Sequence, residues 1–186
     1  MRRGFSLVEI LTCMAIIAIV MAISTPVFVQ AKRRANLTSS QQLMRQFHIS
    51  AKLYQADWGE GGYGDLPAMG LPPVGDNTPI MAMLPNHTID WPSPCGTNPM
   101  WITEPVLFEF IYRPGNGGAE FAEMSQIYQE NQMLFLDVNC DEPGTPVKNP
   151  DFVHRGLGVT LGGQSVHHLK KGQMFLDDAW WTSPPK

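Results

Sequence analysis

The sequence predicts an α+β protein in which one long N-terminal helix packs on a small antiparallel sheet. Two observations predict the helix: an apolar run of 25 residues from Phe5 to Val29, and an apolar stripe at helical spacing that continues to Tyr54. A third observation predicts the sheet, because short apolar runs separated by Gly and Pro fill the C-terminal part. A chain of 186 residues, part of it suited to lipid, leaves enough for one modest folded core.

The apolar run is long enough to cross a bilayer. As a helix it spans roughly 38 Å, which exceeds the ~30 Å hydrocarbon core. A cleavable secretory signal has an apolar core of only about 7–15 residues, so this run is too long for one. An ordinary single-pass anchor fits the length but gives no reason for Glu9. An ionised acid in a membrane helix costs a few kcal/mol and usually has a partner.

The residues around Glu9 suggest that partner. The stretch "RRGFSLVE" (residues 2–9), followed by about twenty apolar residues, resembles the class III signal of type IV prepilins and type II secretion pseudopilins. The resemblance implies cleavage after Gly4 and N-methylation of Phe5 as the new N-terminus. It also implies that Glu9 neutralises the Phe5 amine of a neighbouring subunit, a pairing that offsets desolvation only when both charges are buried together.

The same resemblance implies a set of partners and a location. The partners are the lipid bilayer before assembly, a prepilin peptidase and N-methyltransferase, an inner-membrane assembly platform, and like subunits in a helical filament. Arg2 and Arg3 predict a cytoplasmic N-terminus on a single-pass inner-membrane protein, with the head in the periplasm. After assembly the filament is expected to be periplasmic or extracellular. Pro26 lies where many family members have a helix-kinking proline.

The N-terminal segment is consistent with two functions. The first is a structural subunit of a type IV pilus or type II secretion pseudopilus. The alternative is a membrane-tethered periplasmic binding or adhesion module that does not polymerise.

Composition divides the chain into five expected parts. They are a leader at 1–4, a transmembrane or filament-core helix at 5–29, its amphipathic continuation at 30–58, a Pro/Gly-rich loop region at 59–105, and a sheet head domain at 106–186. The amphipathic stripe is the surface expected to pack on the sheet: Leu37, Ser40, Met44, Phe47, Ala51 and Tyr54.

Within the head, the pattern predicts strands at 106–112 and 133–138, a short helix at 119–130 and a hairpin at 153–171. The tail is expected to dock its aromatic residues, Phe175, Trp180 and Trp181.

The predicted hairpin turns at Gly162-Gly163, since glycines supply positive φ in a two-residue turn. This turn predicts Val159 opposite Val166, and Leu157 opposite His168, on the face that packs against the N-terminal helix.

Cysteine usage leaves two alternatives. Cys95 and Cys140 both fall in the part expected to be exported, where oxidising conditions permit a disulfide. Such a bridge would hold the proline-rich loop at the end of the sheet; otherwise both are unpaired thiols. Cys13 lies in the apolar run and is interpreted as a small apolar residue.

One further segment carries candidate metal ligands. Asp137, Asn139 and Asp141 alternate in the way that calcium loops use, and some pseudopilins hold calcium in a loop of the head. The central Gly and terminal Glu of an EF-hand are absent, so a turn whose side chains cap their own backbone is the alternative. No other cofactor is expected. His167 and His168 cannot share a zinc site, because strand neighbours point to opposite faces.

Several function classes are disfavoured. A net charge of −4 provides no basic face, so no nucleic-acid partner is expected. The sequence contains no nucleophile elbow, no triad signature and no phosphate-binding Gly-rich motif after a strand. It therefore predicts a protein without catalytic residues, and not an enzyme.

Overall fold

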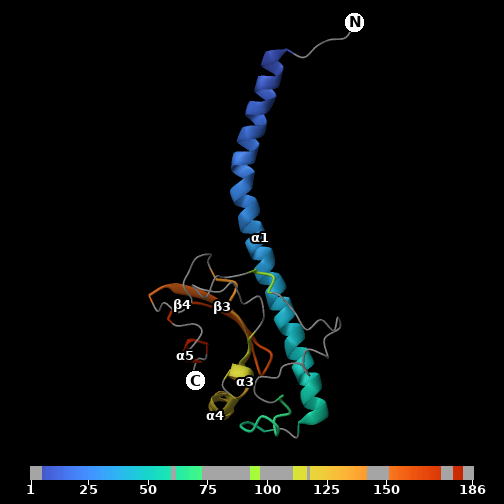
Figure 1. The fold of residues 1–186 in the computed structure, drawn as a ribbon, viewed down its shortest axis with the longest axis vertical. Coiled ribbons are helices and arrows are strands. Elements are labelled where there is room, and N and C mark those ends of the chain that lie inside the picture. The colour runs from blue at the N-terminus through green and yellow to red at the C-terminus, as the bar shows by residue number, and fades with distance from the viewer. Residues whose placement is uncertain are drawn as a thin grey trace. The chain divides into compact units, whose positions relative to one another are not determined.

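The structure is a computed structural model of the chain, shown in Figure 1. It describes residues 6–59, 62–72, 93–96, 111–116, 118–141, 151–172 and 178–181. The chain divides into two compact units, Met1–Asn36 and Leu37–Lys186.

Helix α1 (Leu7–Trp58) is 52 residues long and contributes to both units. Pro26 is the proline within it. The helix ends before Gly59, whose N–H donates to the Gln55 carbonyl at 2.7 Å. A glycine suits this position, because a Cβ at residue 59 would lie 2.8 Å from the same carbonyl oxygen. The predicted long helix is thus confirmed over the part that the structure describes.

The amphipathic stripe is the buried surface of α1 in the second unit. Met44, Phe47 and Ala51 are almost completely buried, and Leu37 and Tyr54 pack against the same core from its margin. Phe47 stacks on Phe135 of the sheet, with ring centroids 5.3 Å apart. Full burial of such a ring contributes about 1.5–3 kcal/mol. The prediction that this stripe packs on a sheet is confirmed.

Within the described residues, the sheet has four antiparallel strands in the order β1-β2-β3-β4. Their bounds are Ile111–Tyr112 for β1, Met133–Asp137 for β2, Val153–Thr160 for β3 and Ser165–Lys171 for β4. The expected strand at 106–112 is therefore described only at its last two residues, since 106–110 lie outside the described ranges. The α+β class predicted from the sequence is confirmed.

Short helices connect and follow the strands. Between β1 and β2 the chain forms α3 (Arg113–Asn116), α4 (Gly118–Tyr128) and the 3₁₀ turn η1 (Gln129–Asn131). The predicted helix at 119–130 corresponds to α4 and η1. The last described element is α5 (Asp178–Trp181).

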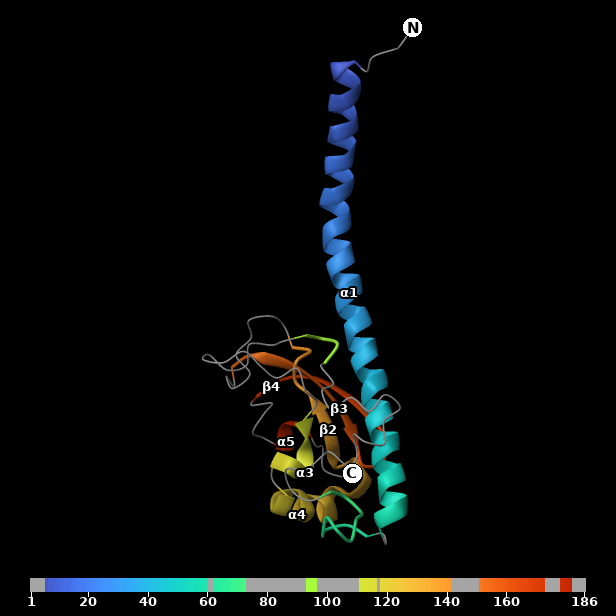
Figure 2. The same ribbon diagram turned by 45° about the vertical axis from the view of Figure 1, so that its right-hand side comes forward.

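The two faces of β3 contact different helices. Leu157 and Val159 belong to the core that includes the α1 stripe. Gly156 lies on the opposite face, where a Cβ would overlap the ring of Trp181. Trp180 and Trp181 are 3% and 2% exposed, so the expected docking of these two rings is confirmed. Phe175, the third aromatic residue expected to dock, lies outside the described residues. Figure 2, together with Figure 1, shows β3 between α5 and the C-terminal part of α1.

The hairpin register differs from the prediction by one residue. Val159 lies opposite Ser165 rather than Val166. Likewise, Leu157 lies opposite His167 rather than His168. Because side chains alternate along a strand, this shift moves Val166 to the face away from α1.

The shift arises because the hairpin loop is longer than two residues. Thr160 N–H donates to the Gln164 carbonyl at 3.0 Å, and Gly163 N–H donates to the Thr160 carbonyl at 2.9 Å. Residues 161–163 therefore form the loop, and Gly163 has φ +82°. A left-handed residue at the end of a three-residue loop is the usual alternative to a two-residue turn.

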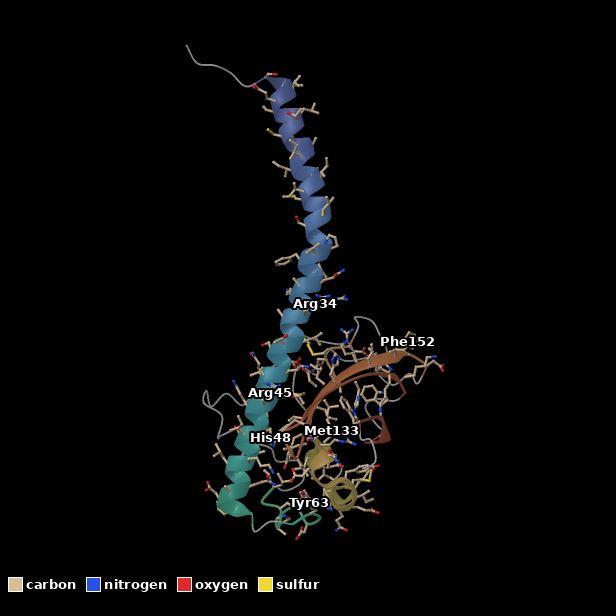
Figure 3. The ribbon with its side chains drawn as sticks, turned by 180° about the vertical axis from the view of Figure 1, so that it is seen from behind. Arg34, Arg45, His48, Tyr63, Met133 and Phe152 are labelled. Atoms are coloured by element: carbon tan, nitrogen blue, oxygen red, sulfur yellow. A yellow bond between two sulfur atoms is a disulfide. The ribbon has the colours of Figure 1, made fainter. Side chains whose placement is uncertain are left out.

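Two polar side chains of α1 reach this hairpin (Figure 3). His48 Nε2 lies 3.0 Å from the Leu161 carbonyl oxygen, and Arg45 Nε donates to Ser165 Oγ at 3.2 Å. The helix thus contacts the hairpin loop and the first residue of β4 through polar side chains, and it contacts β3 through apolar ones.

The hydroxyl of Tyr112 is buried and unpaired within the described residues. Its side chain is 5% exposed, and its hydroxyl has no hydrogen-bond partner in the described part of the chain. Burial raises the pKa of this phenol well above its ordinary value. Because an unsatisfied buried hydroxyl is costly, Tyr112→Phe is expected to leave the free energy of unfolding unchanged or to raise it by up to about 1 kcal/mol.

Urea denaturation of the detergent-solubilised chain measures this effect. The matched control is Tyr63→Phe, which removes a 2.7 Å bond from the phenol to Glu130 Oε1 and is expected to lower stability slightly. A loss of more than about 1 kcal/mol in Tyr112→Phe would show that the hydroxyl has a partner in solution.

Candidate functional site

The first site is the beginning of α1, where Glu9 caps its own helix. Ser6 N–H donates to Glu9 Oε2 at 2.8 Å, and Val8 N–H donates to Ser6 Oγ at 3.2 Å. This reciprocal arrangement is a capping box, in which two unpaired helix donors find acceptors. One carboxylate oxygen of Glu9 is thereby used within the chain. The expected processing residues, Gly4 and Phe5, lie outside the described residues.

The surface around Glu9 is apolar and exposed. Within the described residues, α1 is the one helix that is long and apolar enough to cross a membrane. Large side chains from Leu7 to Phe28 are more than half exposed, which is far beyond the apolar area that a soluble domain normally shows to water. This surface fits membrane anchoring.

The first 25 residues match a known sequence motif. Residues 1–25 match the prokaryotic N-terminal methylation motif, which is the prepilin signature of type IV pilins and pseudopilins. The match confirms the resemblance seen in the sequence and supports a pilin-like or pseudopilin-like protein. It points to a structural subunit rather than an enzyme. No curated protein and no solved structure matches the chain.

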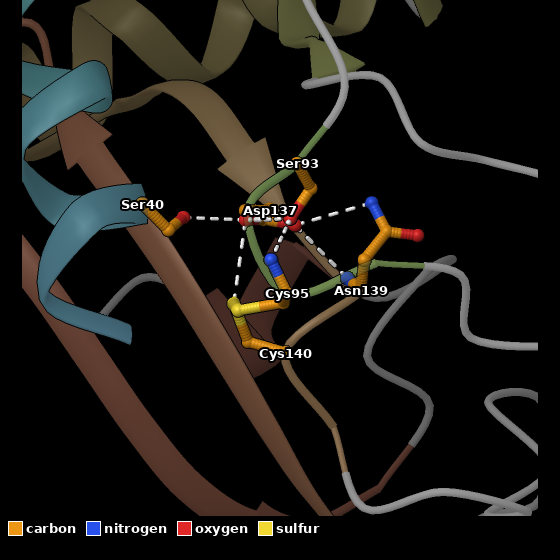
Figure 4. Close-up of a disulfide and its surroundings, with 6 residues drawn as sticks. All are labelled: Ser40, Ser93, Cys95, Asp137, Asn139 and Cys140. Atoms are coloured by element: carbon orange, nitrogen blue, oxygen red, sulfur yellow. Dashed lines mark hydrogen bonds between the residues drawn. A yellow bond between two sulfur atoms is a disulfide. The ribbon is translucent and has the colours of Figure 1, made fainter. Parts of the chain in front are cut away.

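The second site is a buried carboxylate in the head, shown in Figure 4. Asp137 lies at the end of β2 and is completely buried. Its Oδ2 accepts hydrogen bonds from Ser40 Oγ of α1 and, at 2.7 Å, from Ser93 Oγ. Its Oδ1 accepts from the backbone N–H and the side-chain amide of Asn139, at 3.0 and 3.2 Å. One side chain therefore links α1, the 93–96 segment and the end of the sheet.

A disulfide lies beside this carboxylate. Cys95 and Cys140 are joined across a sequence separation of 45 residues. Cys140 Sγ is 3.3 Å from Asp137 Oδ2. Cys95 N–H donates to Ser93 Oγ at 3.2 Å, so the segment 93–96 is held by both the disulfide and the carboxylate. Cys13, in α1, is a free and exposed thiol.

The three candidate calcium ligands do not point to one centre. Asp137 and Asn139 bond to each other, whereas Asp141 faces a different strand. Asp141 Oδ2 lies 2.6 Å from His154 Nδ1, and its Oδ1 accepts from the Arg155 backbone N–H at 3.0 Å. These bonds favour the alternative in which the acidic side chains stabilise turns and strand ends.

The histidines are also separated. His154 is buried beside Asp141, while His168 Nε2 lies 2.8 Å from the Trp181 carbonyl oxygen on the α5 face of the sheet. His167 points to the other face and is mostly exposed, with part of its side chain covered. Partial burial and the positive charge of Arg155 lower the pKa of His167.

Two residues of the buried cluster carry no functional signal in the sequence. Ser40 belongs to the α1 stripe, where its small hydroxyl side chain stands among mainly apolar residues. Its partner, however, is 97 residues away. Ser93 stands in a stretch dense in proline and is 4% exposed. Only the fold brings them to Asp137.

Proposed function

We propose that the chain is a structural subunit of a type IV pilus or a type II secretion pseudopilus. In this proposal the inner membrane stores the apolar half of α1, a prepilin peptidase cuts after Gly4, and Phe5 becomes a methylated N-terminus. The assembly platform then moves the helix into a helical filament of like subunits. The observation that carries the proposal is the methylation motif at residues 1–25, present on a helix whose apolar surface is exposed.

Glu9 is the residue proposed to direct assembly. Before assembly, Glu9 Oε2 accepts a hydrogen bond from the Ser6 N–H. Oε1 has no hydrogen-bond partner in the described part of the chain, so it is the oxygen offered to the Phe5 amine of a neighbouring subunit. Pairing the two charges inside the filament removes the cost of burying either one alone. Each subunit then carries one donor and one acceptor in a head-to-tail contact that does not close.

Mass spectrometry of the protein purified from its native membrane tests the proposed processing. The expected product lacks residues 1–4, begins at Phe5 and carries one additional methyl group. The Phe5 amine is then four residues before Glu9 in the sequence, and the Glu9 carboxylate of a neighbouring subunit is proposed to pair with it.

Two outcomes would contradict the processing. A chain that keeps Met1, or one cut near Ser24, has no amine at residue 5. Either result would favour the alternative, a membrane-tethered module that does not polymerise.

A further inference from the structure

Among the described residues, the buried carboxylate of Asp137 has no cationic hydrogen-bond partner. Its hydrogen-bond donors in the described part of the chain are the hydroxyls of Ser40 and Ser93 and the two nitrogens of Asn139, all of them neutral. Buried carboxylates are ordinarily paired with a cation or bound to a metal. The sulfur atoms of Cys95 and Cys140, which can act as metal ligands, lie beside it.

These three residues can supply one set of metal ligands. A carboxylate oxygen of Asp137 and the sulfurs of Cys95 and Cys140 all lie within 4.8 Å of one another. Ligands of a tetrahedral zinc ion are about 3.5–3.8 Å apart, given Zn–S of about 2.3 Å and Zn–O of about 2.0–2.2 Å. The disulfide holds its two sulfurs closer than this, so the cluster can accept a metal only after the S–S bond is broken.

We propose that, with the disulfide reduced, Cys95, Cys140 and Asp137 bind one Zn²⁺ ion. Two thiolates select zinc over calcium, which prefers oxygen ligands alone. Three protein ligands leave the fourth tetrahedral position to water. The Asn139 nitrogens hold the carboxylate in place through Oδ1, as outer hydrogen bonds do in metal sites. The serine hydroxyls can turn away from Oδ2, since their protons rotate freely.

The charge of the cluster is the same in its two forms. The oxidised cluster carries the single negative charge of Asp137. The zinc form carries two thiolates, one carboxylate and one divalent cation, again a net charge of minus one. Replacing one form by the other therefore adds no buried charge to the head.

Oxidation releases the metal in a balanced exchange. The disulfide of a small dithiol oxidant accepts two electrons from the two zinc-bound thiolates. Cys95 and Cys140 become joined, the oxidant becomes two thiols after taking up two protons from water, and Zn²⁺ leaves. The cluster thus holds zinc in a newly made, reduced chain and exchanges it for the disulfide seen here.

Cobalt(II) titration of the full-length chain in detergent tests this proposal, because Co²⁺ reports thiolate ligands and tetrahedral geometry by its absorption. With the chain reduced by a phosphine, one Co²⁺ per chain is expected to show thiolate charge-transfer and tetrahedral d–d bands that Zn²⁺ abolishes. The oxidised chain is expected to show neither. Cys13→Ser is the matched control and is expected to bind as the wild type does.

Variants assign the ligands. Cys140→Ser is expected to lose the charge-transfer band, and Asp137→Asn to lower the affinity for Co²⁺ at least about tenfold. Because these variants change a buried site, zinc protection of the wild-type thiols against alkylation gives a second measurement without substitution. The proposal is overturned if the reduced wild type shows no tetrahedral thiolate spectrum, if zinc gives Cys95 and Cys140 no protection, or if Cys13→Ser removes the signal.

Discussion

Replacing Glu9 with valine is expected to leave cleavage after Gly4 intact and to abolish incorporation of the subunit into filaments. In the proposed filament this change leaves a neighbour's N-terminal amine buried without its anion. Removing one partner of a buried ion pair costs about 3–5 kcal/mol. A loss of that size lowers the association constant of a subunit at least about a hundredfold. The subunit should therefore accumulate, processed, in the membrane.

The experiment measures the processed mass of the variant and its fraction in sheared filaments. Glu9→Gln separates the two roles of this residue, because glutamine can still accept the Ser6 N–H of the capping box but carries no charge. It is expected to fail in assembly as valine does. Glu123→Val, at an exposed position of α4, is the control for an acid removed from the head.

If Glu9→Gln assembled as the wild type does, capping and not charge pairing would be the role of Glu9. Normal assembly of both Glu9 variants would contradict the filament interpretation of this residue and favour the tethered module.

The sequence predicted the parts of the fold that local pattern determines. The spacing from Leu37 to Tyr54 identified the buried face of α1, because a helix repeats every 3.6 residues whatever it packs against. The short apolar runs bounded by Gly and Pro identified β2 and the hairpin, because this pattern is also local to the chain. The motif around Glu9 was also visible, since its residues are consecutive in the chain.

Other features depend on geometry that the sequence does not contain. The observed hairpin register differs from the predicted one by one residue, because a glycine pair is compatible with both a two-residue and a three-residue loop. Asp137 was interpreted as a member of a local Asp/Asn pattern, whereas two of its hydrogen-bond partners, Ser40 and Ser93, are distant in sequence. No periodicity relates such residues, so their meeting is decided by the packing of α1 on the sheet.

Asp137→Ala is expected to destabilise the head by about 3–5 kcal/mol, because it removes a completely buried carboxylate and leaves several buried donors without their acceptor. Ser40 Oγ, Ser93 Oγ and the Asn139 backbone N–H would each lose their acceptor. A buried donor left unsatisfied costs about 1–3 kcal/mol, so partial relaxation still leaves a loss in this range. Urea denaturation of the oxidised, detergent-solubilised chain gives the free energy of unfolding.

A graded series makes this result specific to the carboxylate. Ser40→Ala removes one donor and is expected to cost about 1.5–3 kcal/mol, the usual value of a hydrogen bond to a charged group. Glu123→Ala, on the surface of α4, is expected to change stability by less than about 0.5 kcal/mol. Alkylation followed by mass measurement verifies that each variant keeps the Cys95–Cys140 disulfide, so that its loss does not enter the comparison. If Asp137→Ala unfolded within about 1 kcal/mol of the wild type, the disulfide and the apolar core alone would hold α1 and the 93–96 segment to the sheet, and the carboxylate would have no structural role.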